Sequence, residues 1–238
     1  MNTGCRGTDI PDQRKAEYYD DISRTIFFPV YPVIAHQILK KADIDEGSCL
    51  DIGSGTGYLA IALATLSDLM VFGLDNSEPM CRVAEANVKK YRLERRVRPV
   101  FGDVKAIPFD TSSMDLVVSR GSFFFWENLS RGFSECLRVL RPGGMAYIGG
   151  GFGNARLRDE IVVRMRERDP DWEDNRRGWY ANCSPHIVRS ALAAAGILEY
   201  DMIQDDSGYW VCFYKGGTNG KTRKRLQRKT KKTGKICV

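Results

Sequence analysis

The stretch that decides the fold reads Asp-Ile-Gly-Ser-Gly-Thr-Gly-Tyr-Leu and occupies residues 51–59. A short apolar run at 48–52 leads into it, and an apolar, alanine-rich run follows at 58–66. Glycine at alternate positions lets the backbone turn sharply and approach a ligand closely, while the first turn of a helix offers free N–H groups. The stretch therefore predicts a strand at 48–52, a helix at 58–66 and a nucleoside-binding loop between them.

Segments of strand and helix character alternate along the chain that follows this loop. Further strands are expected at 69–74, 97–101, 116–119 and 145–149, and helices at 78–88 and 129–140. Ser77 is a suitable N-cap for the first of these helices, and Pro142-Gly143-Gly144 is expected to stop the second. Such alternation predicts an α/β fold with a mostly parallel, doubly wound sheet and helices on both faces.

The two ends of the folded part extend this pattern. Helices are expected at 11–42, 156–168 and 185–195, and strands at 197–203 and 209–214. An Asp-Asp-Ser-Gly turn at 205–208 would join the last two strands into a hairpin and place an antiparallel strand in the sheet. The complete expectation is a Rossmann-like, seven-stranded, mostly parallel sheet with an antiparallel last strand.

Two aspartates indicate what the glycine loop binds. Asp75 stands twenty positions after Gly55, at the end of the second expected strand, where a carboxylate can accept both ribose hydroxyls. Asp51 precedes the first glycine, and the third glycine, Gly57, comes one position earlier than in dinucleotide-binding loops. A carboxylate at position 51 disfavours a pyrophosphate and suits an ammonium group. The loop therefore favours S-adenosyl-L-methionine, which carries an ammonium and no phosphate, over NAD.

Five motifs, in the family's order, make the chain resemble class I S-adenosylmethionine-dependent methyltransferases. Residues 51–57 are similar to the first motif of that family, and Asp75 is similar to its ribose-binding acid. Its adenine-contacting motif has a counterpart in Gly102-Asp103-Val104, its fourth strand in 114–118, and the turn before its fifth strand in 140–144. The resemblance implies a methyltransferase with S-adenosyl-L-methionine as cofactor.

More specifically, the chain resembles the ubiquinone/menaquinone-biosynthesis type of small-molecule methyltransferase, and within it a prokaryotic subgroup. Phe-x-Pro-x-Tyr-Pro, Ser-Arg-Gly-Ser-x-Phe-Phe-Trp-Glu and Gly-Gly-Gly-Phe-Gly-Asn mark that subgroup, and they appear here at 27–32, 119–127 and 149–154. The resemblance implies a helical lid at 1–42 over a methyltransferase domain at 43–214. It also implies a small-molecule acceptor and an association with a corrinoid protein.

The loop chemistry and the resemblance together define the candidate site. The residues expected to bind the cofactor are Asp51, Gly53, Ser54, Gly55, Gly57, Asp75, Asn76, Met80, Gly102, Asp103, Val104, Ser119 and Arg120. The residues expected to bind the acceptor are Tyr19, Phe28, Tyr31, Arg120, Phe124 and Trp126. The aromatic loop at 119–127 would form an apolar or planar pocket, in which Arg120 is available for an anionic group. The alternative is that its aromatic side chains pack under the following helix.

Methyl transfer from a sulfonium is an in-line displacement with a good leaving group, so positioning supplies much of the rate. A general base is needed only where the acceptor must lose a proton, and no residue stands out for that role. Glu127, in the aromatic loop, and His186, near the start of an expected helix, are the two candidates. A structural role is the alternative for His186. Asp115 is expected to be a turn or strand-leading acid outside the site.

Composition and local sequence argue against several other classes. Only two histidines occur, and the seven cysteines are scattered without a Cys-x-x-Cys pair, so we expect no metal site and buried, reduced thiols. Apolar stretches are too short to span a bilayer and the start of the chain is polar, which predicts a cytoplasmic protein without membrane insertion. The loop at 119–122 lacks both the Pro-Pro-aromatic signature of amino-nitrogen methyltransferases and the cysteine of cytosine-5 enzymes.

The net charge of +6 comes from the end of the chain. Residues 215–238 contain ten Lys and Arg residues and neither Asp nor Glu. This composition predicts a disordered tail. Such a tail is either solvated without a dedicated ligand or makes weak, nonspecific contact with nucleic acid through phosphates. Two alternative functions therefore stay open: an RNA methyltransferase recruited by the basic tail, and a non-catalytic adenosylmethionine-binding partner of a corrinoid protein.

Overall fold

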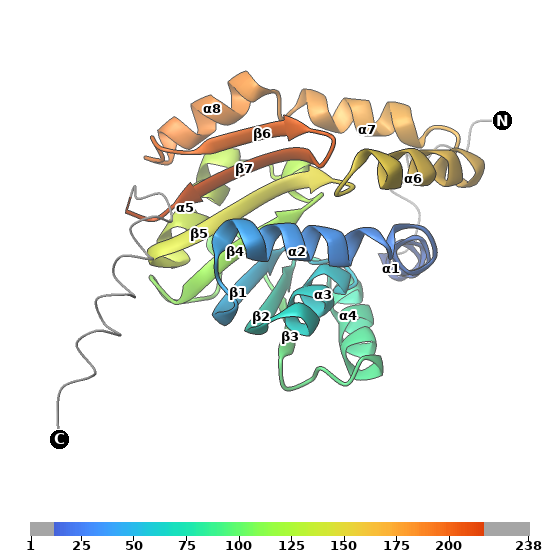
Figure 1. The fold of residues 1–238 in the computed structure, drawn as a ribbon, viewed down its shortest axis with the longest axis horizontal. Helices are drawn as coiled ribbons and strands as arrows, with labels where there is room; N and C mark the ends of the chain where they lie inside the picture. Colours follow the sequence, from blue (N-terminus) through green and yellow to red (C-terminus); the bar gives the residue numbers. More distant parts are fainter. Residues whose placement is uncertain (1–11, 217–238) are drawn as a thin grey trace.

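A computed structural model describes residues 12–216 of the chain. Its centre is a seven-stranded sheet with the strand order β3-β2-β1-β4-β5-β7-β6 (Figure 1). The neighbours from β3 to β5 pair in parallel, whereas β7 is antiparallel to both β5 and β6. The expected seven-stranded, mostly parallel sheet with an antiparallel last strand is confirmed.

The strands and helices alternate as the sequence indicates. The strands are β1 Glu46–Ile52, β2 Asp68–Asp75, β3 Val97–Phe101, β4 Met114–Arg120, β5 Leu140–Gly151, β6 Asp201–Asp205 and β7 Gly208–Tyr214. The α-helices are α1 Asp12–Ile22, α2 Val30–Ala42, α3 Tyr58–Leu66, α4 Glu78–Lys90, α5 Leu129–Val139, α6 Ala155–Arg168, α7 Trp172–Ala181 and α8 Pro185–Ala194. Three short helical turns complete the list: η1 Ser23–Phe27, η2 Val104–Ala106 and η3 Phe123–Phe125.

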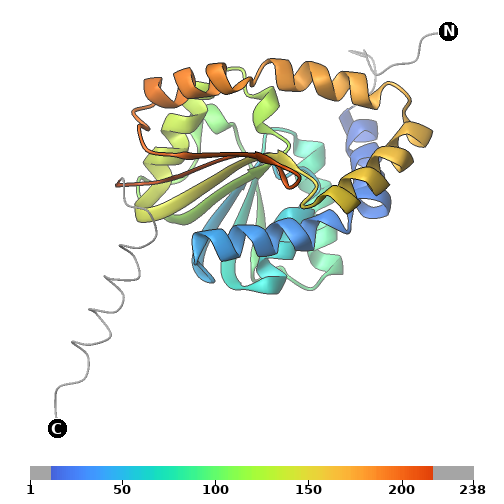
Figure 2. The ribbon, with the colours of Figure 1, turned by 45° about the horizontal axis from the view of Figure 1, so that its top comes forward.

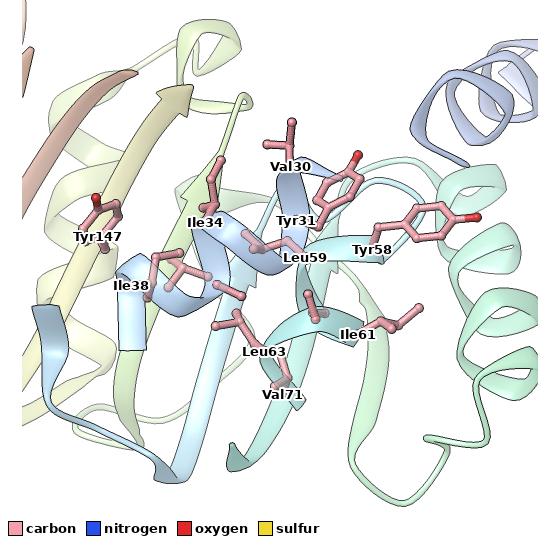
Figure 3. Packing of buried hydrophobic residues seen from close by; sticks show 14 of the residues in the cluster. Val30, Tyr31, Ile34, Ile38, Tyr58, Leu59, Ile61, Leu63, Val71 and Tyr147 are labelled. Carbon is pink, nitrogen blue, oxygen red and sulfur yellow. The ribbon is translucent and has the colours of Figure 1, made fainter. Parts of the chain in front are cut away.

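Two apolar layers cover the two faces of the sheet, and Figure 2 shows the sheet between them. On one face α2 and α3 pack together, and Ile34, Ile38, Leu63 and Val71 of β2 belong to one buried cluster (Figure 3). The opposite layer contains the buried faces of α5 and α8. Strand β1 serves both layers, because Cys49 belongs to the first and Leu50 to the second. Burial on both faces explains why the central strands are continuous apolar runs rather than alternating ones.

The N-terminal segment, expected to be helical at 11–42 with a break at Pro29 and Pro32, is helical and is divided there. It consists of α1, a π-helical turn at η1, and α2, whose N-cap is Pro29. Pro32 lies in the first turn of α2, where its missing N–H leaves no intrahelical bond unmade. The prolines therefore divide the segment into two helices.

Three expectations need correction. Helix α7 lies in a charged segment to which no element was assigned, because its apolar residues are few. The strand expected at 197–203 begins only at Asp201, because α8 ends at Ala194 and is followed by a connection that contains Gly196, with a φ of 76°. Pro142-Gly143-Gly144 lies inside β5, which starts directly after α5 at Leu140.

Some expectations concern parts of the chain that the structure does not describe. Residues 1–11 of the expected lid and residues 217–238 of the expected basic tail lie outside the described residues. The five cysteines within 12–216 are buried and form no disulfide, as expected of reduced thiols. No helix between residues 12 and 216 is long and apolar enough to cross a membrane.

Candidate functional site

A cavity of about 490 Å³ lies at the carboxyl ends of β1, β2 and β4. Open α/β sheets bind their ligands at this edge. The N-terminal segment covers part of it, because Tyr19, Ser23 and Tyr31 belong to its lining. All the residues expected to bind the cofactor line this cavity, with the exception of Gly57 and Ser119. The structure therefore brings together at one place what the sequence spreads over 70 residues.

The glycine loop after β1 has a backbone that other residues would strain. Gly53 and Gly55 have φ values of 64° and 53°, in the left-handed region. A Cβ atom on Gly53 would also lie 2.2 Å from the Cβ of Ser122, which is closer than any real contact. The N–H groups of Gly53 and Ser54 donate to the carbonyl of Leu74 at 2.7 and 3.1 Å, so the end of β2 holds the loop.

Gly57 and Ser119 support the cavity from behind its wall. Gly57 is the N-cap of α3, has a φ of 86°, and leaves only 3.2 Å between an added Cβ and the Cβ of Ala84. The hydroxyl of Ser119 lies 2.6 Å from the hydroxyl of Ser122, which also bonds to the carbonyl of Ile52 at 2.9 Å. Both residues therefore fix the loops that form the lining.

Asp75 lies at the end of β2 with its carboxylate in the cavity wall. One oxygen accepts from the N–H of Gly55 at 2.8 Å and the other from the N–H of Ser77 at 3.0 Å. Burial raises the pKa of this carboxyl above its ordinary value, and the backbone hydrogen bonds oppose the rise. Each oxygen keeps a second lone pair for a ligand.

Asp51 is the most deeply buried charged group of the site, with 1% of its surface exposed. Its Oδ2 atom is buried and has no hydrogen-bond partner among the described residues. Burial raises the pKa of Asp51 to about 8, Asp75 adds to the rise, and a backbone hydrogen bond from Ala60 and the charge of Arg120 oppose it. A buried carboxylate oxygen without a partner fits a bound ammonium group, because such an oxygen is costly until a cation or donor meets it.

The opposite end of the cavity is formed by Asp103, Lys105 and Glu127. Asp103 accepts from the backbone N–H of Lys105 at 2.8 Å, and the ammonium of Lys105 lies 3.5 Å from the other oxygen of Asp103. The same ammonium forms an ion pair with Glu127. Glu127 is thus at the rim of the cavity, exposed and already paired. His186, the other candidate base, is exposed at the start of α8 and lines neither this cavity nor the adjoining one.

A second cavity, of about 160 Å³, adjoins the first and is called the aromatic chamber here. It shares Tyr19, Tyr31 and Arg120 with the large cavity, and Phe124 lines it as well. Trp126 lines the large cavity, where its indole N–H donates to the hydroxyl of Ser122 at 3.3 Å. The expected acceptor residues therefore meet here, apart from Phe28, which is exposed and packs edge-on against the ring of Tyr58.

Sequence reasoning missed several lining residues. In the large cavity these are Ser23, Thr56, Tyr58 and Lys105, among others. In the chamber they include Trp172, Arg176, Trp179 and Tyr180, all from α7. A signal existed, since Trp172, Trp179 and Tyr180 stand at i, i+7 and i+8, which is the spacing of one helical face. The surrounding charges obscured it.

Comparison with known proteins agrees with this geometry. Residues 50–148 match the family model of a methyltransferase domain. A solved structure from Methanococcus maripaludis, assigned as an S-adenosyl-L-methionine-dependent methyltransferase, is 41% identical with a TM-score of 0.82 and covers 89% of this chain and 97% of its own. A malonyl-(acyl-carrier protein) O-methyltransferase from Methylococcus capsulatus is 35% identical over 51% of this chain and 42% of its own length. A demethylmenaquinone methyltransferase from Chlorobaculum tepidum is 36% identical over 43% of this chain and 40% of its own length. The chain thus spans less than half the length of these two curated relatives.

Proposed function

The chain belongs to the S-adenosylmethionine-dependent methyltransferases, and we propose that it transfers the methyl group of that cofactor to a small-molecule acceptor. The observation that carries the proposal is the junction of two cavities. The larger is lined by Asp75 and by Asp51, whose buried Oδ2 has no hydrogen-bond partner among the described residues, and it shares Arg120 and Tyr31 with the aromatic chamber. One cavity thus suits a charged nucleoside and the other a compact, largely apolar acceptor.

Three carboxylates along the large cavity define how the cofactor would be held. Asp51 would bind its ammonium group and Asp75 the ribose hydroxyls, while Asp103 would accept from the amino group of the adenine. Gly53 and Gly55 would bring the backbone close to the ligand, since neither carries a side chain that could intervene. When bound, the cofactor supplies an activated methyl group on a sulfonium.

The acceptor side works by positioning rather than by a strong base. The rings of Phe124 and Tyr180, with centroids 4.4 Å apart, narrow the chamber, and the N-terminal residues Tyr19 and Tyr31 close it toward the cofactor cavity. Holding the acceptor in line with the methyl group and excluding water can supply much of the rate of such a displacement. Glu127 and His186 stay candidate bases. Neither is favoured, because Glu127 is already paired with Lys105 and His186 lines neither cavity.

The relatives point the same way on the type of acceptor. The curated relatives include enzymes whose names specify a demethylmenaquinone and a phytylhydroquinone as the methylated compound. A chamber of about 160 Å³ fits part of a small molecule far better than a folded RNA. An experiment has to separate this proposal from two alternatives, an RNA methyltransferase recruited by the basic tail and a partner of a corrinoid protein.

The proposal is tested by incubating the full chain with methyl-labelled adenosylmethionine and one of three acceptor fractions. These fractions are the dialysable small molecules of a bacterial extract, purified RNA, and a corrinoid-containing protein fraction. We expect label to appear in the small-molecule fraction, and not with an Asp51→Ala variant. Transfer of label to RNA alone, or to no fraction at all, would contradict the proposal.

A further inference from the structure

The aromatic chamber has an unusual balance of charge. Its lining contains two guanidinium groups, Arg120 from the end of β4 and Arg176 from α7. Aromatic side chains form most of the remaining wall, and no Asp or Glu among the described residues lines it. Two cations in apolar surroundings are costly unless an anion accompanies them.

Arg120 is fixed with part of its guanidinium unused. Its Nε and one Nη donate to the carbonyl of Gly151 at 3.3 and 3.2 Å. The group lies over the rings of Phe27 and Tyr31, at 5.1 and 5.3 Å from their centroids. No carboxylate of the described residues forms an ion pair with it, so its remaining N–H groups are available to a ligand.

Arg176 is held in a comparable way from the other side. Its guanidinium lies 5.2 Å from the ring of Trp172 and 5.3 Å from that of Phe152, and 5.9 Å from the ring of Tyr180. Its Nε atom is buried and has no hydrogen-bond partner among residues 12–216. Glu173 on the same helix forms an ion pair with Arg166 instead. The aromatic contacts fix the position of the cation, and a side-chain hydrogen bond with Tyr180 uses part of its donor capacity, but its Nε is left for a ligand.

Both guanidiniums border the same part of the chamber, because Arg120 lies over Phe27, Arg176 lies over Phe152, and these two rings stack with their centroids 6.3 Å apart. Burial raises the pKa of the Tyr180 hydroxyl, and the charges of both Arg176 and Arg120 oppose that rise. Tyr180 therefore lies within the field of the two cations. The chamber also shares Ser23 and Gly121 with the cofactor cavity, so a ligand bound between the two arginines would lie beside the cofactor.

We propose that the acceptor is a small organic carboxylate, whose carboxylate binds to Arg176 and Arg120 and whose flat body lies against Phe124 and Tyr180. This inference rests on the function proposed above and specifies the substrate class of the same site. The guanidinium fork matches the two oxygens of a carboxylate. A volume of about 160 Å³ is close to that of a cavity that binds a single benzene ring, so the part of the acceptor inside the chamber is about as large as benzoate.

The test measures binding to the full chain loaded with adenosylhomocysteine, and does not depend on turnover. The probes are benzoate, phenylacetate and cinnamate, each compared with its neutral amide and with phenyl phosphate, and binding is followed by ligand-observed NMR. Arg176 is the residue to change, because it lines the chamber and not the cofactor cavity. The variants are Arg176→Gln and Arg176→Lys, and Arg177→Gln is the matched control on the exposed side of α7.

We expect at least one carboxylate to bind about tenfold or more tightly than its amide, and Arg176→Gln to remove that preference. Arg176→Lys should retain part of it and Arg177→Gln all of it. Equal binding of acid and amide, preference for phenyl phosphate, absence of carboxylate binding, or an Arg176→Gln variant that behaves as the control would each overturn the inference. Adenosylhomocysteine affinity and melting temperature are measured on every variant. Failure of the wild type to bind adenosylhomocysteine would count against the proposed function itself, whereas normal binding without a carboxylate preference would remove only this inference.

Discussion

The carboxylate of Asp75 accepts a hydrogen bond from the backbone N–H of Gly55 at 2.8 Å. The acid that ends β2 thus also holds the glycine loop that follows β1, twenty positions earlier in the chain. Its second oxygen accepts from Ser77 at the start of α4. One side chain therefore connects three elements that surround the nucleoside site, and its loss would affect both the ligand and the loop.

Asp75→Ala should weaken the binding of adenosylhomocysteine about 10- to 100-fold, since hydrogen bonds to a charged group contribute about 1.5–3 kcal/mol and tenfold corresponds to about 1.4 kcal/mol. The same variant should melt at a lower temperature, because two backbone donors lose their acceptor. Calorimetric titration and thermal unfolding measure the two effects. Asp68→Ala, at the opposite and exposed end of β2, is the matched control and should leave affinity unchanged. Equal affinity for both variants would contradict the role of Asp75.

Asp51 should make cofactor binding depend on pH. Its pKa, raised to about 8 by burial, means that the free protein holds a proton there at pH 6, and an arriving ammonium group displaces it. The affinity for adenosylhomocysteine should therefore rise by about tenfold per pH unit from pH 6 and level off above about pH 8. Calorimetry in buffers of different ionisation enthalpy should detect the released proton.

The stability of the free protein should change in the opposite sense. A carboxyl whose folded pKa lies above its unfolded value contributes stability at low pH, and this contribution is lost as pH rises toward about 8.

In Asp51→Asn both the proton release and the pH dependence of affinity should disappear. A wild-type affinity that does not vary between pH 6 and 8 would show that Asp51 does not meet the ammonium group.

Asn87 connects the N-terminal segment to the glycine loop. Its side-chain amide donates to Asp20 of α1 at 2.7 Å and to the carbonyl of Thr56 at 3.0 Å, and the residue is buried. Asn87→Ala should lower the free energy of unfolding by about 1–3 kcal/mol, because buried acceptors lose their donor. Amide hydrogen exchange in α1 should become faster. Asn182→Ala, at the exposed end of α7, is the control and should change neither the free energy of unfolding nor the exchange in α1. Unchanged exchange in Asn87→Ala would show that Asn87 does not connect the N-terminal segment to the glycine loop.

Two helical glycines should respond to alanine with opposite signs. In α5 a Cβ on Gly132 would lie 2.5 Å from the indole of Trp126, whereas nothing lies within 4 Å of that position on Gly178 in α7. Gly178→Ala should therefore stabilise the protein by about 0.5–1 kcal/mol, as expected for an unobstructed helix position. Gly132→Ala should destabilise it by about 1–3 kcal/mol and change the tryptophan fluorescence. Urea unfolding compares the two, and stabilisation by both substitutions would show that the indole is loosely packed.

Local sequence was sufficient to predict the central α/β pattern. The run at 58–66 became α3 with the expected bounds, and Ser77 caps α4 by accepting from the N–H of Met80. Helix α3 is apolar nearly all round, and α4 buries Cys81, Ala84 and Val88 at helical spacing, so the burial of both follows from sequence. Helix α7 could not be found in this way, because only Trp172 among its residues is fully buried and its identity as a helix depends on packing over the chamber.

The residues of the candidate site also fall into those that local sequence predicted and those that it did not. The cofactor residues lie in short motifs, so their order along the chain predicted their meeting at one edge of the sheet. Arg176 is 56 positions after Arg120, on an element that was not expected, and no local pattern relates the two. Their convergence arises only when β5 carries the chain across to α6 and α7.

The central claim is that the glycine loop and its acids hold S-adenosyl-L-methionine. Calorimetric titration of the wild-type chain with adenosylhomocysteine, with NADH as the comparison ligand, tests it most directly. The account predicts binding of adenosylhomocysteine with a dissociation constant of about micromolar order, or −8 kcal/mol, and no heat from NADH. Binding of NADH, or of neither ligand, would contradict it.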